Sequence, residues 1–174
     1  MALEVHTQPL TAEGFAPFGA VVSAGLGDGA AANQGTALRY SFGESLESTR
    51  ATARPSLCVY RSVARSLPLE LTLLERHPCS SQAFLPMLTL GASTVTAARL
   101  LVCVAPAKAD GSPDVAALVA FVGVPGQGVN YRVGVWHHPI VALDAPADLA
   151  MLAWEDGSPL DCIEWPLAEP VRVG

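Results

Sequence analysis

Residues 127–139 read QGVNYRVGVWHHP and place a glycine-containing turn, an Asn, a Tyr, an Arg, a Trp and two adjacent His within thirteen positions. The rest of the chain is rich in Ala, Val and Leu and holds only two further His. The apolar runs on either side of Gly134 have the length and β-branched content of short strands. This stretch therefore predicts a β-rich fold that carries a polar functional site.

Short apolar or alternating runs, separated by Gly, Pro, Asp and Ser, extend the same pattern from residue 55 onward. Such spacing indicates an antiparallel barrel or sandwich. A chain of 174 residues has room for one sizeable core, so we expect a single mainly β domain over residues 1–174. The expected strands are Leu57–Ser62, Leu69–Glu75, Gln82–Leu88, Val95–Ala105, Val119–Val122, Val129–Val133, Val135–Leu143, Leu149–Trp154 and Asp161–Trp165.

One or two short helices interrupt the predicted strands. Ser112, followed by Pro113 and an acidic residue, has the features of an N-cap and predicts a helix to about Ala120. Thr11 can cap a shorter helical turn within residues 11–19. Residues 23–35, SAGLGDGAAANQG, predict a flexible loop.

Composition and charge exclude several classes of function. Hydrophobic residues make up 51% of the chain, yet no run of about 18 apolar residues lacks Pro, Gly or charge, so no membrane span is expected. The opening residues MALEVHTQPL lack a basic segment and an apolar core, and the cytoplasm is the expected compartment. A net charge of −6 with a single Lys argues against a nucleic-acid or anionic-membrane partner. A few Arg can still bind a small carboxylate in a bidentate manner.

Side-chain alternation predicts which polar residues share a cavity. In a strand, Glu75 and His77 project from one face and Arg76 from the other, and Gln82 begins the next predicted strand. By the same rule His137 and the following His point in opposite directions, so we expect only one of them in the cavity. The favoured set is therefore Glu75, His77, Gln82 and His137.

This set has the chemistry of a metal site. Imidazole, carboxylate and amide oxygen suit a divalent transition metal such as Ni, Mn, Fe or Zn. The four Cys form no C-x-x-C pair, which excludes a zinc knuckle or a thioredoxin-like motif. Cys79, close to His77, keeps a nucleophilic role open as an alternative.

The spacing Glu75-x-His77-x4-Gln82, followed by a Pro-Gly turn at residues 125–128 and then His137, resembles the two motifs of cupins. In cupins the first motif reads H-x-H-x4-E, so Glu75 stands here for a His and Gln82 for the Glu. The resemblance implies a cupin-like antiparallel β-barrel, or double-stranded β-helix, in which these four residues could bind the metal.

Several longer strings resemble the ureidoglycolate lyase family, formerly called ureidoglycolate hydrolase. The strings are F-x-P-F-G from residue 15, N-x-G-x3-R at 33–39, LERHPCSSQAFLPM at 74–87, the PD-x-A-x-L-x-AF segment from 113, and QGVNYRVGVWHHP. The similarity covers about residues 9–165 and departs at residues 88–114, a longer link than is usual in the family. It implies a homodimeric enzyme of purine and allantoin breakdown, sometimes described with nickel, that splits (S)-ureidoglycolate into glyoxylate and urea.

The proposed reaction requires a base, an acid and a cation that holds the substrate carboxylate. Acid and base candidates are Glu75, His77 and His137. Candidates for substrate binding are Arg39, Arg61, Arg76, Gln82 and Asn130, and Arg39 could instead contribute across a dimer interface. Two alternatives remain open: a cupin-like enzyme for another small 2-hydroxy or 2-oxo acid, and a non-catalytic module that binds such an acid.

Overall fold

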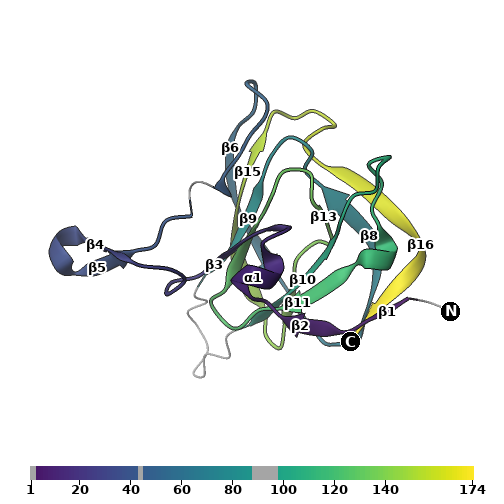
Figure 1. The fold of residues 1–174 in the computed structure, drawn as a ribbon, viewed down its shortest axis with the longest axis horizontal. Coiled ribbons are helices and arrows are strands. Elements are labelled where there is room, and N and C mark those ends of the chain that lie inside the picture. The colour runs from purple at the N-terminus through teal and green to yellow at the C-terminus, as the bar shows by residue number, and fades with distance from the viewer. Residues whose placement is uncertain (1–2, 43–44, 88–97) are drawn as a thin grey trace.

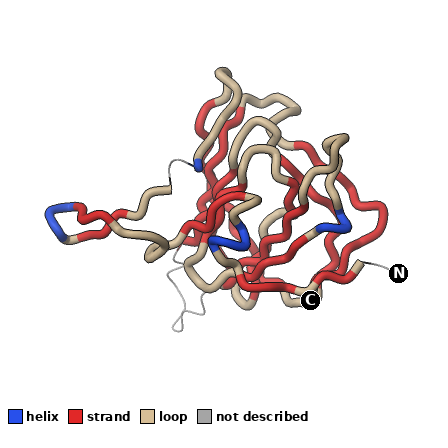
Figure 2. Tube along the Cα trace, in the orientation of Figure 1, coloured by secondary structure: helices blue, strands red, loops and turns tan. Residues whose placement is uncertain are grey.

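A computed structural model describes residues 3–42, 45–87 and 98–174 of the chain. Within these ranges strands dominate, and the helical residues form short turns only (Figure 2). The mainly β, cupin-like class expected from the sequence is confirmed. The described strands form two large sheets that share no strand, so the architecture is an open sandwich and not a closed barrel (Figure 1).

Sheet A, on the right in Figure 1, is built around β8 (Leu69–Arg76) and β10 (Arg99–Ala105). β10 is buried along most of its length, as expected for a strand covered on both faces. All strands that pair with β8 and β10 do so antiparallel, whereas three short strands join the sheet in parallel pairs. The order is β1 (Glu4–Val5), β16 (Ile163–Val173), β8, β13 (Trp136–His137), β10, β11 (Val119–Val122) and β2 (Thr7–Pro9), with β14 (Val141–Leu143) beside β10 and β7 (Ala64–Arg65) beside β14.

Sheet B packs against sheet A and encloses the main core. Along β15 buried and partly exposed residues alternate, because only one face of this strand meets the core. The core centres on Phe15, whose ring contacts Phe121 of sheet A and Tyr131 of sheet B edge-on. The order of sheet B is β3 (Gly19–Val22), β12 (Gly128–Tyr131), β9 (Gln82–Met87), β15 (Ala147–Glu155) and β6 (Arg54–Ser62).

In the N-terminal region the structure confirms one prediction and corrects another. Thr11 caps the single turn α1 (Ala12–Phe15) by accepting a hydrogen bond from the Gly14 amide at 3.0 Å. The loop expected up to residue 35 instead contains a hairpin, formed by β4 (Ala30–Ala32), the turn η1 (Asn33–Gly35) and β5 (Ala37–Arg39). The turn uses positive φ angles, which Asn and Gly adopt readily. We call residues 30–39 the arm, because they project from the sheets (Figure 1).

The helix expected from Ser112 to about Ala120 is wrong. Ser112 bonds Asp110 instead of capping a helix, and only the turn η3 (Val115–Ala117) forms before the backbone becomes extended at Leu118. Leu118 and Ala120 are buried in the core, and the packing of this segment as β11 overrides the local capping signal. Among the described residues, no helical segment is long and apolar enough to cross a membrane.

Most of the predicted strands form, with altered ends. The strand expected over Val135–Leu143 is split into β13 and β14 around Pro139, which cannot donate a ladder hydrogen bond. The strand expected over Val129–Val133 ends at Tyr131, before the turn at Gly134, whereas the last strand continues to residue 173. The expected ends of two strands, at residue 88 and at residues 95–97, lie outside the described residues.

Candidate active site and metal centre

Four of the side chains predicted to share a cavity meet between the two sheets. His137 on β13 lies directly opposite Glu75 on β8 in an antiparallel pair, so both side chains project from one face of sheet A. His77 lies just beyond the end of β8, and Gln82 begins β9 of sheet B. Two strand ends and one cross-strand pair thus bring together residues that are as many as 62 positions apart.

The distances within this cluster are short. His137 Nε2 lies 3.4 Å from Glu75 Oε1 and 3.1 Å from Gln82 Oε1. The His77 and His137 rings are stacked with centroids 5.6 Å apart. One ligand atom from each of Glu75, His77 and His137 lies within 4.8 Å of the other two. His77, Gln82 and His137 are buried, so these groups act in an environment with little water.

Backbone carbonyls fix the proton on each imidazole ring. His77 Nδ1 faces the carbonyl of Asp161, and His137 Nδ1 lies 2.9 Å from the carbonyl of Val135. A carbonyl can only accept, so each Nδ1 donates, and in the neutral ring each Nε2 carries the lone pair. In the neutral form of the two rings, both Nε2 lone pairs are therefore available inside the cluster.

Atoms that can accept a hydrogen bond or bind a cation converge in the cluster. His77 Nε2 is buried and has no hydrogen-bond partner among the described residues. His137 Nε2 faces the carboxylate of Glu75 and the amide oxygen of Gln82, which also present lone pairs. A cation at this point would satisfy all of them, and ligating His residues commonly donate their other ring nitrogen to a carbonyl, as both do here. The donor set thus fits a divalent transition metal.

The charge state of the cluster agrees with this fit. Burial opposes ionisation of Glu75, but the hydrogen bond and charge that His137 supplies in its protonated form, followed by the charge of protonated His77, lower the pKa of the carboxyl below its ordinary value. Burial, followed by the charge of His137, lowers the pKa of His77. At neutral pH the cluster therefore holds a carboxylate and an uncharged His77, which are the protonation states that metal ligands need.

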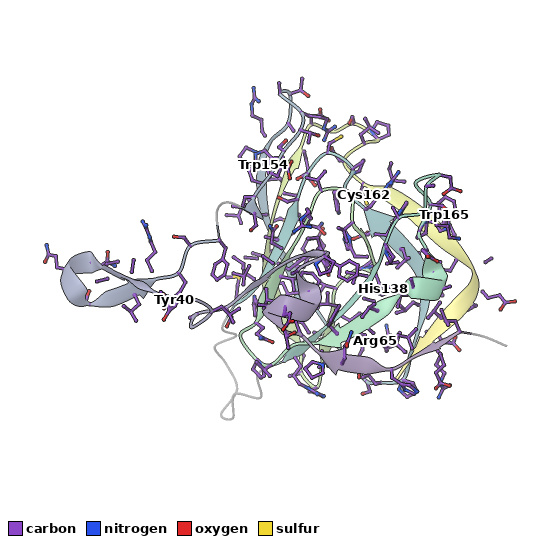
Figure 3. All side chains as sticks on the ribbon, in the orientation of Figure 1. Tyr40, Arg65, His138, Trp154, Cys162 and Trp165 are labelled. Atoms are coloured by element: carbon purple, nitrogen blue, oxygen red, sulfur yellow. The ribbon has the colours of Figure 1, made fainter. Side chains whose placement is uncertain are left out.

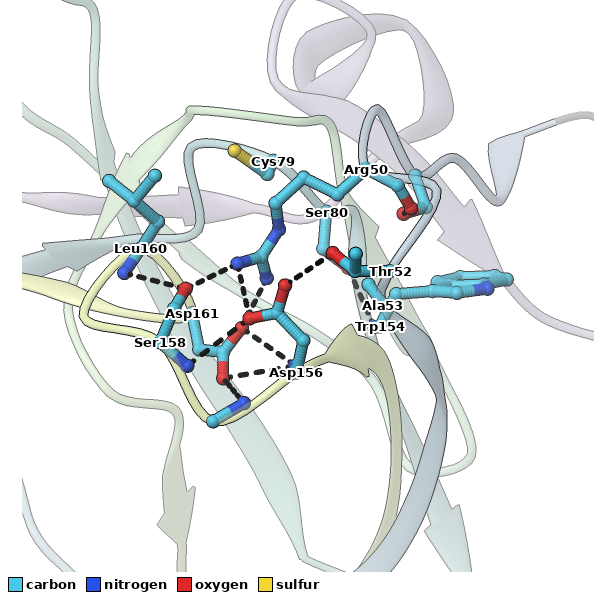
Figure 4. Close-up of polar contacts among 12 residues, drawn as sticks. Arg50, Thr52, Ala53, Cys79, Ser80, Trp154, Asp156, Ser158, Leu160 and Asp161 are labelled. Carbon is cyan, nitrogen blue, oxygen red and sulfur yellow. Dashed lines mark hydrogen bonds and ion pairs between the residues drawn. The ribbon is translucent and has the colours of Figure 1, made fainter.

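A polar network outside the cluster holds the carbonyl that orients His77 (Figure 4). The Arg50 guanidinium binds the carboxylates of Asp156, at 2.6 Å, and Asp161. Asp161 also accepts from the Gly157 amide at 2.7 Å, and Thr52 donates to Asp156 at 2.7 Å. These bonds fix the loop 156–161 and hence the Asp161 carbonyl. Sequence reasoning missed this role because it depends on a main-chain atom.

Two further side chains border the cluster. Tyr131 stacks on His137 with centroids 4.0 Å apart, and its buried hydroxyl has no partner among the described residues. Cys162 is exposed and donates its thiol to Glu75 Oε2 at 3.8 Å. Although the residue as a whole is exposed, partial burial of its sulfur, followed by the charge of Glu75, raises the pKa of Cys162 to about 12, which keeps the thiol protonated. Glu75 Oε2 therefore faces the more open side of the cluster.

The three Arg proposed for carboxylate binding lie elsewhere in this chain. Arg76 projects from the opposite face of β8, as alternation predicted, and its guanidinium lies 4.5 Å from the Trp136 ring centroid. Arg61 is 81% exposed and bonds Asp148 at 2.8 Å. Arg39 ends β5 on the arm. The described residues thus show no Arg in hydrogen-bond or ion-pair contact with the cluster.

Asn130 lies on the other side of sheet B. Its neighbour Tyr131 faces the core, so Asn130 projects from the outer face of sheet B, where it is buried and its amide donates to the Ser45 carbonyl at 2.6 Å. The Asn130 side chain lines an outer cavity of about 290 Å³ with Glu47 and Arg132. The structure therefore separates Asn130 from the cluster.

Two other residues considered from the sequence, His138 and Cys79, lie outside the cluster. His138 is not one of the ligand-type residues that meet in the cluster, and its Nδ1 donates to the Pro139 carbonyl at 2.7 Å. Cys79 is half-buried beside Arg50, on the network in Figure 4. In the described chain Glu75, His77, Gln82 and His137 are thus the only predicted site residues that meet.

Comparisons with known proteins all indicate the same family. A family model described as ureidoglycolate lyase matches residues 2–174. A ureidoglycolate lyase of Burkholderia cepacia is 38% identical over 164 residues, which cover 94% of this chain and 86% of the relative. One of Pseudomonas fluorescens (strain SBW25) is 34% identical over 167 residues, covering 95% and 93%. On this evidence the chain belongs to the ureidoglycolate lyase family.

Proposed function

We propose that this protein is a lyase that cleaves (S)-ureidoglycolate to glyoxylate and urea. The relatives described above carry the name ureidoglycolate lyase. The observation that supports the same activity here is the cluster of a carboxylate, two imidazoles and an amide oxygen held between the sheets. This combination can bind a metal and also move a proton.

The reaction transfers one proton within the substrate. The hydroxyl on the carbon between the carboxylate and the ureido nitrogen loses its proton, the carbon–nitrogen bond breaks, and the departing urea nitrogen gains a proton. A single group that accepts the first proton and donates it to the nitrogen balances the reaction. We assign this role to Glu75 Oε2, which is turned to the open side next to Cys162.

The remaining groups of the cluster would hold a metal ion and keep the two imidazole rings in place. His77 Nε2, His137 Nε2 and Glu75 Oε1 would bind a divalent metal such as nickel, with Gln82 Oε1 as a fourth donor. When bound, the metal would act as a Lewis acid toward a substrate oxygen. The Asp161 and Val135 carbonyls keep both rings in the required tautomer, and Tyr131 supports His137 by stacking.

Release of urea and glyoxylate from (S)-ureidoglycolate tests the proposal. Purified protein, stripped of metal and then supplied with Ni²⁺ or Mn²⁺, should release both products above the spontaneous rate. Glu75→Gln should lower kcat by at least about 100-fold, because it removes the proton carrier while keeping the shape. His138→Ala, beside the cluster, is the matched control. Absence of release by the metal-supplied wild type would contradict the lyase activity, and turnover of another small 2-hydroxy acid would favour the alternative substrate.

We also propose the cytoplasm as the site of this activity and a homodimer as the active form. The four Cys are free thiols in the structure, which agrees with a reducing compartment.

A further inference from the structure

The outer cavity beside β3 lies over a part of sheet B that carries small side chains. Asn130 of β12, which lines this cavity, pairs with Ala20 of β3 on one side and with Ala83 of β9 on the other, and paired side chains project from the same face. Gly19 also lines the cavity, and a Cβ at this position would lie 2.0 Å from the Asn130 carbonyl oxygen. The sheet thus leaves open space around the Asn130 side chain.

The Asn130 side chain has one satisfied and one unsatisfied end. Only 1% of the residue is exposed, and its Nδ2 donates to the Ser45 carbonyl at 2.6 Å. Its Oδ1 is buried and has no hydrogen-bond partner among the described residues. An unpaired buried acceptor costs free energy, so its presence in a native fold requires an explanation. A donor bound in the cavity would supply the missing hydrogen bond.

Two residues of opposite charge line the same cavity without pairing. Glu47 and Arg132 are both exposed, and neither forms an ion pair with any residue that the structure describes. The Arg132 guanidinium donates to the carbonyls of Ala16, at 3.0 Å, and Pro17, at 3.3 Å, which are both uncharged. A small molecule between the two side chains could therefore meet both charges at once.

Hydrogen bonds hold the backbone on both sides of the cavity. The Glu47 amide donates to Ser81 Oγ at 2.9 Å, and the Glu47 carbonyl accepts from the Ser81 amide at the same distance. On the other side, the Arg132 amide donates to the Phe18 carbonyl at 2.9 Å. Groups on a fixed backbone lose less freedom when a ligand binds, so this arrangement favours binding.

We propose that the outer cavity is a second binding site, which takes a small α-amino acid in its zwitterionic form. The carboxylate of the ligand pairs with the Arg132 guanidinium, and its ammonium group donates to Asn130 Oδ1 and to the Glu47 carboxylate. A cavity of about 290 Å³ is at the small end of ligand sites, which favours amino acids with short side chains. A neutral molecule such as urea would leave both charges unpaired.

This site does not depend on the proposed lyase activity. Asn130 and Tyr131 project from opposite faces of β12, and Tyr131 is the one that stacks on His137 of the cluster. Cys162, which borders the cluster and is labelled in Figure 3, directly precedes β16 of sheet A, whereas the cavity lies beside β3 of sheet B. Amino-acid binding and ureidoglycolate cleavage can therefore be tested separately.

Calorimetric titration of the purified protein with glycine tests the choice of ligand. Glycine should bind with millimolar affinity at one site per chain. Methylamine, glycolate and urea each lack at least one of the two charged groups and should bind at least about tenfold more weakly. Equal affinity for any of these three compounds would overturn the assignment of a zwitterion. No detectable binding of glycine, alanine or serine would overturn the site itself.

Single substitutions and NMR locate the bound glycine. Glu47→Gln keeps the size of the side chain but removes its charge, and it should weaken glycine binding at least about tenfold. Glu70→Gln removes an exposed carboxylate of β8 and is the matched control, for which the affinity should stay unchanged. In wild type, glycine should shift the side-chain amide signals of Asn130. Binding that Glu47→Gln leaves unchanged, or that does not move these signals, would place glycine elsewhere and overturn the proposal.

Discussion

The metal site proposed for Glu75, His77, Gln82 and His137 predicts a specific gain in thermal stability. A ligand at 100 times its dissociation constant stabilises the folded state by about 2.7 kcal/mol, which for a domain of this size corresponds to a rise in Tm of roughly 5–11 °C. Ni²⁺ added to metal-free wild type should produce a rise in this range in differential scanning calorimetry. His137→Ala removes the imidazole nitrogen that lies next to both Glu75 and Gln82 and that we propose as a metal ligand. If affinity falls about 100-fold, the rise at the same Ni²⁺ concentration shrinks to roughly 1–2 °C.

His138→Ala is the control for this experiment, because the neighbouring ring bonds the Pro139 carbonyl and is not one of the ligand-type residues that meet in the cluster. It should keep the full rise in Tm. The quantity to compare is the rise caused by Ni²⁺ and not the metal-free Tm, since replacing buried His137 lowers that value in any case. Equal rises in the two variants, or none in wild type, would refute the assignment of the donors.

Three further predictions follow from single contacts. Gln82→Glu adds a charge to the donor set and should tighten Ni²⁺ binding by about tenfold in a chelator competition titration. Burial opposes ionisation of Asp161, but Arg50 and two backbone amides lower its pKa, so its stabilising effect is complete above the ordinary carboxyl range and is lost as the pH falls through the lowered value. Arg50→Gln should therefore move acid unfolding, followed by near-UV circular dichroism, to higher pH. Phe15→Ala should lower the free energy of unfolding in urea by about 3–5 kcal/mol, because this fully buried ring joins both sheets.

Alternation along single strands was the most reliable guide in this sequence. It separated Glu75 and His77 from Arg76, and His137 from the following His, because a side-chain period of two is a local property of extended backbone. It could not show which face of β12 meets the core, and Asn130 in fact projects from the outer face of sheet B, where it bonds the Ser45 carbonyl. The choice of face depends on which strands become neighbours.

Local capping signals were reliable only where packing agreed with them. Thr11 forms the expected cap, and the turn it begins places Phe15 in the core. Ser112 has an equally good capping pattern, yet the residues after it are needed as a buried strand beside β10. The burial of several apolar side chains outweighs a cap, which contributes about 1 kcal/mol.

The orientation of the His77 and His137 rings depends on atoms that carry no sequence signal. His77 is fixed by the carbonyl of Asp161, and any residue at position 161 would offer the same carbonyl. What the Asp side chain adds is its bond to Arg50, which holds the loop in place (Figure 4). Asp161→Asn should therefore weaken the loop while leaving the carbonyl present, and the loss of activity should be smaller than for His77→Ala. Identical losses would mean that the loop itself, and not the carbonyl, determines how His77 is presented to the substrate.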